Sequence, residues 1–107
     1  MNRELEGVIE TLKSLEEQIR KEYKAEIVGV FGSYARGEQK GSSDLDILAK
    51  FAEGATLFDF VGLGNFLEEK LNLKVDIVSE RALREELREG IFKEVVRVWR
   101  GNKTFTR

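Results

Sequence analysis

Two short apolar runs, joined by a turn rich in glycine and serine, constrain the fold of this chain more than any other feature. The runs cover residues 27–31 and 45–51 and are dominated by aliphatic and aromatic side chains. Short runs of this kind, bounded by turn residues, predict strands. The turn opens with Gly32 and Ser33, and Asp44 and Asp46 lie at the start of the second run. These polar residues therefore lie where strands meet loops, which is where proteins commonly bind ligands.

The two aspartates at the start of the second run are separated by one residue. Side chains alternate along a strand, so Asp44 and Asp46 share one face while Leu45 enters the opposite layer. Two carboxylates on one face form a site for a hard cation such as Mg²⁺. Asp44 taken alone would be interpreted as a turn cap beside Ser42 and Ser43. Its phase with the second aspartate and with the glycine-serine turn favours a metal ligand.

The glycine-serine turn predicts an anion site. Gly32 allows unusual dihedral angles and a close approach of the backbone, and Ser33 can start a short helix whose free N–H groups face an anion. The turn would then cradle the phosphates of a nucleoside triphosphate. A P-loop is excluded because Glu38 and Gln39 lie where that motif requires lysine and serine or threonine. The alternative interpretation is that Ser33 and Arg36 simply shape and brace a turn.

A third acidic residue, Asp76, lies between Val75 and Ile77 in a strand predicted over residues 74–79. It is the only acidic residue in that run, and a charge there is costly to desolvate unless it is paired or binds a metal. If this strand lies beside the second run, the three carboxylates converge. Asp76 could then bind metal and accept the proton of an acceptor hydroxyl. A plain edge-strand charge is the alternative interpretation.

Composition excludes several classes of site. The 107 residues include 18 basic and 20 acidic residues, for a net charge of −2, so there is no global basic field for gripping a long nucleic acid. Cysteine and histidine are both absent, which removes structural zinc sites, disulfides, thiol nucleophiles and histidine bases. Catalysis must therefore fall to carboxylates. No apolar stretch approaches the roughly twenty residues of a membrane span, so we expect a cytoplasmic protein without membrane contact.

Helices are predicted from apolar periodicity. The first covers residues 2–21, and its apolar stripe consists of Leu5, Val8, Ile9, Leu12, Leu15 and Ile19. The second covers residues 56–71, and its expected inward side consists of Leu57, Phe60, Val61, Gly64, Leu67 and Leu71. Ser79 is the predicted N-cap of a third helix, which holds Ala82, Leu83, Leu87 and Ile91.

Strands are predicted over residues 26–31, 44–51, 74–79 and 95–99, with a short helix near Tyr34. The first two strands can pair antiparallel, and the helix between the second and third allows those two to be parallel. The predicted fold class is α/β (α+β), with a small mixed sheet of about four strands and helices packed on it. We expect a single domain over residues 1–107, with Tyr34, Phe92 and Trp99 in its core.

Three segments carry a resemblance to a known family. They are FGSYARGE at residues 31–38, SSDLDIL at residues 42–48 and LKVDIVS at residues 73–79. Together they resemble the minimal nucleotidyltransferases (MNT) of the DNA polymerase β superfamily. Those are small proteins that are often paired with a HEPN-domain ribonuclease toxin. The likeness covers residues 27–99, and its three-part motif is specific.

The resemblance implies a polymerase-β-type nucleotidyltransferase fold and the transfer of AMP from ATP to a hydroxyl, with two Mg²⁺ ions. It implies nucleotide binding by Gly32, Ser33 and Arg36. It implies that the catalytic carboxylates and metal ligands are Asp44, Asp46 and Asp76. The implied acceptor is a tyrosine of a HEPN-type toxin, so that the chain would act as an antitoxin by AMPylation.

Two other functions stay open at this point. The chain could be a non-catalytic antitoxin that neutralises its partner by contact alone. It could also modify a small molecule, as the related aminoglycoside nucleotidyltransferases do. The chain is short for building such a pocket alone, although a homodimer could build it.

Overall fold

A four-stranded sheet forms the centre of the computed structural model, which describes residues 3–98. The strands are β1 (Ala25–Phe31), β2 (Leu45–Phe51), β3 (Val75–Ser79) and β4 (Val96–Arg97). The helices are α1 (Arg3–Ser14), α2 (Glu16–Tyr23), α3 (Ser33–Arg36), α4 (Leu57–Leu71), the 3-10 helix η1 (Glu80–Ala82) and α5 (Glu85–Glu94). The strand order in the sheet is β3-β2-β1-β4. The predicted mixed sheet with packed helices is confirmed.

The pairing directions also agree with the prediction. Strand β1 pairs antiparallel with β2, and β2 pairs parallel with β3 across the connection through α4. Strand β4 pairs antiparallel with the other side of β1. The two strands that carry the predicted aspartates are therefore adjacent, with β3 at one edge of the sheet.

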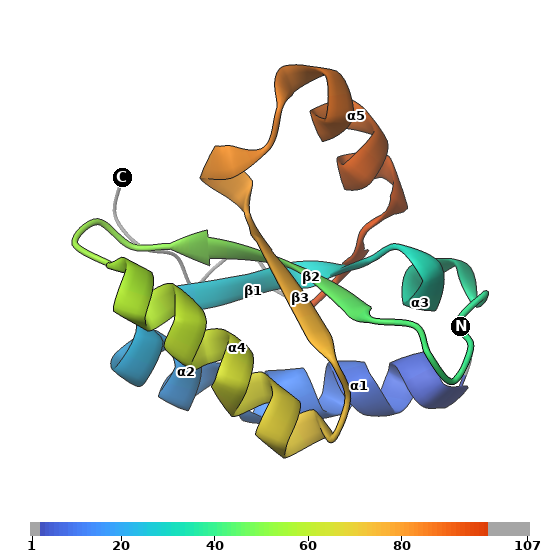
Figure 1. Cartoon of the computed structure of the whole chain (residues 1–107), viewed down its shortest axis with the longest axis horizontal. Helices are drawn as coiled ribbons and strands as arrows, with labels where there is room; N and C mark the ends of the chain where they lie inside the picture. Colours follow the sequence, from blue (N-terminus) through green and yellow to red (C-terminus); the bar gives the residue numbers. More distant parts are fainter. Residues whose placement is uncertain (1–2, 99–107) are drawn as a thin grey trace.

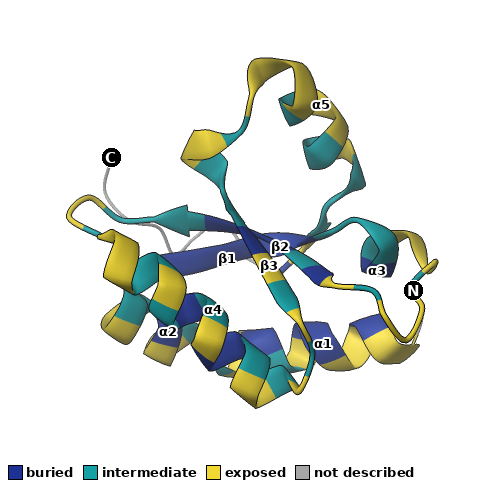
Figure 2. Cartoon of the chain, viewed as in Figure 1, coloured by how far each residue is buried: buried dark blue, intermediate teal, exposed yellow. Residues whose placement is uncertain are grey.

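The hydrophobic core lies between one face of the sheet and the helices that cover it. Figure 1 shows α1, α2 and α4 together on this face, whereas α5 stands over the opposite face. Alternation along β2 explains the packing, because Leu45, Ile47 and Ala49 are fully buried on the helix-covered side. The burial colouring in Figure 2 follows this division, with buried residues along the inner sides of α1 and α4. The opposite face of β2 carries Asp46, one of the predicted site residues.

The first helix is broken where the sequence predicted continuity. Helix α1 ends at Ser14 and α2 begins at Glu16, with Leu15 at φ −96° and ψ 0° between them. The Ser14 hydroxyl donates to the carbonyl oxygen of Thr11 at 2.7 Å, and so competes for an acceptor of the helix backbone. The break leaves the apolar stripe intact, because Leu12 and Ile19 on either side of it are fully buried.

The inward side of α4 was predicted wrongly at its start. The helix begins after Thr56, close to the predicted start at residue 56. The Thr56 N–H donates to Asp59 Oδ2 at 2.8 Å and so caps the helix. However, Leu57 and Val61 are 74% and 52% exposed. The buried residues of the helix are Leu63, Phe66 and Leu67. The helix is apolar on more than one side, so periodicity alone could not identify the packed side.

The C-terminal elements are shorter than predicted. Ser79 precedes the single 3-10 turn η1, and Leu83 and Arg84 then adopt extended backbone before α5 begins at Glu85. The last strand contains only Val96 and Arg97. Trp99, which was predicted to be buried, lies outside the described residues. Within residues 3–98, the helices lack the length and apolar character that crossing a membrane requires.

The β1–β4 pairing gives a first testable prediction, because Gly29 lies against β4 with no room for a side chain. A Cβ atom at Gly29 would collide with the carbonyl oxygen of Val96 and lie 2.8 Å from Cγ2 of Val95. Gly29→Ala should therefore lower the free energy of unfolding in urea by about 1–3 kcal/mol. Gly7→Ala in α1 is the matched control, since nothing lies within 4 Å of its added Cβ. Equal stability of the two variants would contradict this close packing.

Candidate active site

Strand register places two of the predicted carboxylates side by side. Asp46 of β2 is the register partner of Asp76 in β3 and of Phe31 in β1. Register partners in neighbouring strands project from the same face of a sheet. That face is the one opposite the main core, because Leu45, Ile47 and Ile77 occupy the core side. Asp46 and Asp76 therefore point toward the side on which α5 stands.

The third predicted carboxylate, Asp44, lies just outside the strand. Strand β2 begins at Leu45, not at Asp44, and the Leu45 N–H donates to the carbonyl oxygen of Lys74 at 2.8 Å. Asp44 is exposed and lines a hollow of about 540 Å³ with Ser42 and Ser43. Its charge nevertheless reaches Asp46, because it helps to raise the pKa of that residue. The negative charges of Asp44 and Asp76 are thus both felt at Asp46.

Asp46 has the perturbed electrostatics of a crowded acidic site. Burial raises the pKa of Asp46 above its usual value, and the charges of Asp76 and Asp44 raise it further. Arg36 lowers the pKa, and Glu94 raises it. A carboxylate whose ionised form is disfavoured by neighbouring acids is a suitable ligand for a cation that would relieve the repulsion.

The turn after β1 approaches this carboxylate closely. Gly32 has φ +76° and ψ −153°, a conformation that side chains strongly disfavour. A Cβ atom there would collide with the Asp46 carboxylate. The predicted short helix follows as α3, which ends where Gly37 adopts φ +73°. The glycine therefore permits both the sharp turn and its contact with the acidic site.

The other residues of the turn differ in burial: Tyr34 packs in the core, whereas Ser33 and Arg36 are more accessible. Tyr34 is buried and belongs to the core, as predicted. Ser33 is half-buried at the start of α3, and Arg36 is exposed at its end. Arg36 Nε donates to Glu38 Oε1 at 2.9 Å, which keeps the guanidinium beside the turn.

Glu94 is the residue of this site that the sequence analysis missed. It lies at the end of α5, yet its carboxylate accepts the Gly32 N–H at 2.6 Å and the Arg36 Nη1 at 2.8 Å. The chain separations are 62 and 58 residues. No motif or spacing marks Glu94 among the several acids of its helix, so only the tertiary structure could identify it.

The donor set fits magnesium on chemical grounds, since carboxylate oxygens are hard ligands. In the part of the chain that the structure describes, no three acidic side chains converge closely enough to hold an ion among them. Mg²⁺ commonly takes one or two carboxylates and completes its shell with phosphate oxygens and waters. An ion shared between these aspartates and a triphosphate agrees with that preference and with the raised pKa of Asp46.

Comparison with known proteins supports the same class of site. Residues 12–104 match the family model of the nucleotidyltransferase domain. The protein adenylyltransferase MntA of Thermococcus cleftensis is 38% identical over 94 residues, which are 88% of this chain and 95% of that protein.

Solved structures share the fold. A protein proposed to be a minimal nucleotidyltransferase is 45% identical with a TM-score of 0.68, over 82% of this chain and 93% of that one. A complex of the tri-AMPylated HEPN toxin of Shewanella oneidensis with an MNT antitoxin matches with a TM-score of 0.60. Its identity is 19%, over 85% of this chain and 71% of that one, which shows the fold alone. With its matched domain, fold and site geometry, the chain belongs to the nucleotidyltransferase domain family.

Proposed function

We propose that the chain transfers AMP from Mg-ATP to a tyrosine hydroxyl of a HEPN-type ribonuclease toxin and so acts as the antitoxin of a toxin–antitoxin pair. The observation that carries the proposal is the contact of the Gly32 turn with Asp46, beside the register partner Asp76. The name of the Thermococcus cleftensis relative supports protein adenylylation. The AMPylated toxin in complex with an MNT antitoxin supports the kind of acceptor.

In this proposal each residue of the site has a distinct part. The Gly32 N–H, Ser33 and Arg36 bind phosphate oxygens of the nucleotide. Asp44, Asp46 and Asp76 would each provide carboxylate oxygens for magnesium, whose shell phosphate oxygens and waters would complete; the bound metal would neutralise charge on the phosphates. Two ions are the expected number.

Asp76 also accepts the proton of the acceptor hydroxyl. The hydroxyl oxygen forms a bond to the α-phosphorus, the bond from that phosphorus to the bridging oxygen of the β-phosphate breaks, and pyrophosphate leaves. The residue that receives the proton must therefore be open to the acceptor as well as near the metal.

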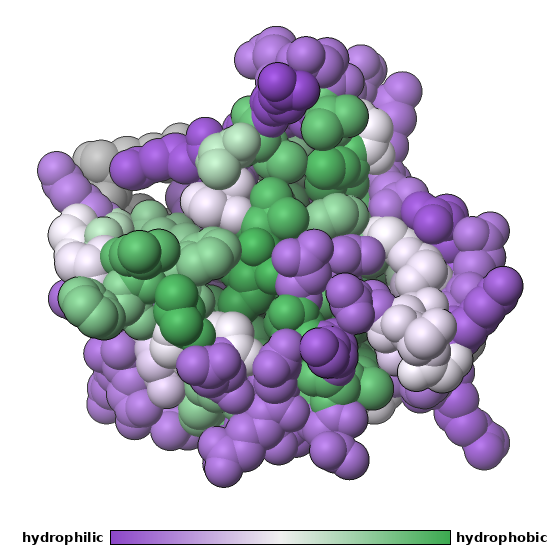
Figure 3. Space-filling view, viewed as in Figure 1, coloured by the Kyte–Doolittle hydropathy of each residue, from purple (hydrophilic) through white to green (hydrophobic). Residues whose placement is uncertain are grey.

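The position of Asp76 suits an acceptor that arrives from outside the chain. Asp76 is exposed, and β3 is an edge strand with nothing paired beyond it in the described sheet. A protein side chain can approach this edge without crossing the core. The first turns of α4 add an exposed apolar surface made by Leu57, Phe58 and Val61. Figure 3 shows green hydrophobic atoms over the first turns of α4 and purple atoms over the rest of the helix; an exposed apolar patch of this kind suits contact with another protein.

The first test is transfer of label from α-labelled ATP with Mg²⁺ to a purified HEPN-type protein, taken from the neighbouring gene if that gene encodes one. The wild type should label the partner, and Asp44→Ala with Asp46→Ala should reduce labelling on the order of a hundredfold or more, because the charge-neutralising site is lost. Glu53→Ala in the exposed β2–α4 loop is the control and should retain labelling.

The same assay separates the competing functions. Partner neutralisation by the double variant without any labelling would indicate an antitoxin that works by contact alone. Label on a small molecule but not on the partner would indicate a small-molecule transferase. Loss of labelling when the acceptor tyrosine is replaced by phenylalanine would identify the hydroxyl.

A further prediction concerns the stability of an Asp46 variant, because a residue kept for metal binding need not stabilise the fold. The folded pKa of Asp46 is raised, so the folded state binds more protons and stability falls as pH rises through that pKa. Asp46→Asn should therefore raise the melting temperature at pH 7 by about 2–5 °C in the absence of divalent ions.

This gain should shrink as pH falls through the raised pKa of folded Asp46 and vanish below the usual range for aspartate, where the wild-type carboxyl is neutral in both states. Asp59→Asn is the control, since Asp59 accepts a capping hydrogen bond from Thr56 and should bring no gain. A lower melting temperature for Asp46→Asn would show that the carboxylate stabilises the fold and would count against its role as a metal ligand.

A further inference from the structure

The carboxylate of Glu94 lies where the proposed function places the phosphates. It accepts the backbone N–H of Gly32 at 2.6 Å with one oxygen and Arg36 Nη1 at 2.8 Å with the other. These are the donors that a triphosphate would need at this turn. A short bond from an N–H to a carboxylate is charge-assisted and strong, so the donors are well occupied.

A triphosphate and Glu94 cannot use these donors together. One backbone N–H makes one good linear hydrogen bond, so a phosphate oxygen must replace the Glu94 oxygen at Gly32. Charge adds to this exclusion, because Glu94 lies close enough to Asp46 to raise its pKa. A polyanion that enters the same space would be repelled by this fourth acidic group.

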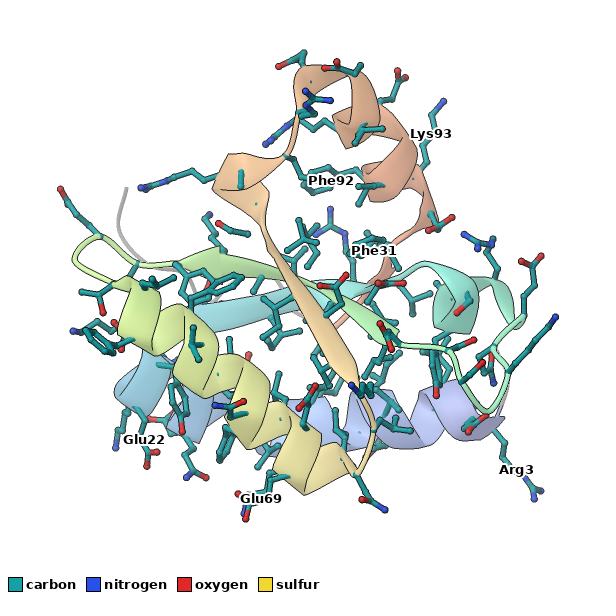
Figure 4. The ribbon with its side chains drawn as sticks, in the orientation of Figure 1. Arg3, Glu22, Phe31, Glu69, Phe92 and Lys93 are labelled. Atoms are coloured by element: carbon teal, nitrogen blue, oxygen red, sulfur yellow. The ribbon has the colours of Figure 1, made fainter. Side chains whose placement is uncertain are left out.

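Helix α5 is built in a way that allows Glu94 to leave. None of its residues is buried, and extended backbone precedes it at Leu83 and Arg84 and follows it at Val95. Figure 4 shows its Phe92 and Lys93 on different sides of the helix, above the sheet that carries Phe31. An element with few buried contacts opens at a low free-energy cost. Arg36 keeps a second partner in Glu38 at 2.9 Å, so it stays beside the turn when Glu94 departs.

We propose that Glu94 is a residue of the nucleotide-binding site that occupies the Gly32 and Arg36 donors in the free protein and is displaced by the triphosphate of the incoming nucleotide. It thereby sets the nucleotide affinity, because every binding event includes the loss of its two hydrogen bonds. The inference rests on the proposed function for the identity of the ligand, and on the contacts of Glu94 for the competition.

The test is the dissociation constant for a non-hydrolysable ATP analogue with Mg²⁺, measured by calorimetry. Glu94→Ala should bind the analogue roughly tenfold more tightly than the wild type, because the competing carboxylate is gone. Glu94→Gln keeps an oxygen acceptor but loses the charge, so it should bind with intermediate affinity. Glu89→Ala removes an acid from the same helix that pairs with Lys93 instead, and should match the wild type.

A second readout follows the Gly32 amide proton by NMR in the absence and presence of the analogue. Glu94→Ala should move this signal upfield in the free protein, and the analogue should move it downfield again in every variant. Affinity that is unchanged or weaker in both Glu94 variants would overturn the inference. Thermal melts of each variant confirm that it is folded before it is compared.

The outcomes also separate this inference from the proposed function. If the wild type binds the analogue and Asp44→Ala with Asp46→Ala does not, nucleotide binding at this site stands. Failure of the Glu94 variants to tighten binding then overturns the competition alone. Absence of binding by the wild type and by both Glu94 variants would overturn the competition and the proposed function together.

Discussion

The antiparallel pairing of β1 with β2 is the constraint on which the rest of the site depends. Its register sets Phe31 opposite Asp46, so the residue that follows β1 must turn directly against the carboxylate. Only glycine allows that turn, because Gly32 has a positive φ and any Cβ would collide with Asp46. The parallel pairing of β2 with β3 then places Asp76 on the other side of the same carboxylate. The acidic centre is therefore a consequence of sheet register.

The fold tolerates this crowding because the two faces of β2 have separate tasks. Leu45 and Ile47 are fully buried against the helix-covered side and stabilise the sheet. Asp46 projects to the other side, where burial and neighbouring acids raise its pKa. The buried core on the other side of the strand offsets the unfavourable free energy of placing Asp46 there. Sites of this kind commonly trade stability for the capacity to bind a cation.

The parts of the structure that could be predicted from sequence are the local ones. Gly32, Asp44 and Asp46 lie within one short segment, so their spacing alone was enough to single them out, although β2 begins only at Leu45. Asp76 was identifiable as the one acid in an apolar run. Glu94 was not, because its partners lie 58 and 62 residues away and its helix contains several similar acids. The exposed start of α4 was missed for a related reason. The helix itself has apolar side chains on more than one side, and only tertiary packing determines which side is buried.

The two flanks of Asp46 differ in a way that suggests an order for the two substrates. On the β1 side, Glu94 at the end of α5 contacts the Gly32 turn and Arg36. The hydrogen-bond donors of this group suit a phosphate chain. On the β3 side, Asp76 lies exposed on an edge strand that another protein can reach. Displacement of Glu94 would remove one acidic group from beside Asp46, but the triphosphate brings its own negative charge, so the carboxylates and the phosphates would together attract the cation. In the proposed function, the acceptor hydroxyl would reach this centre from the open edge of the sheet at β3.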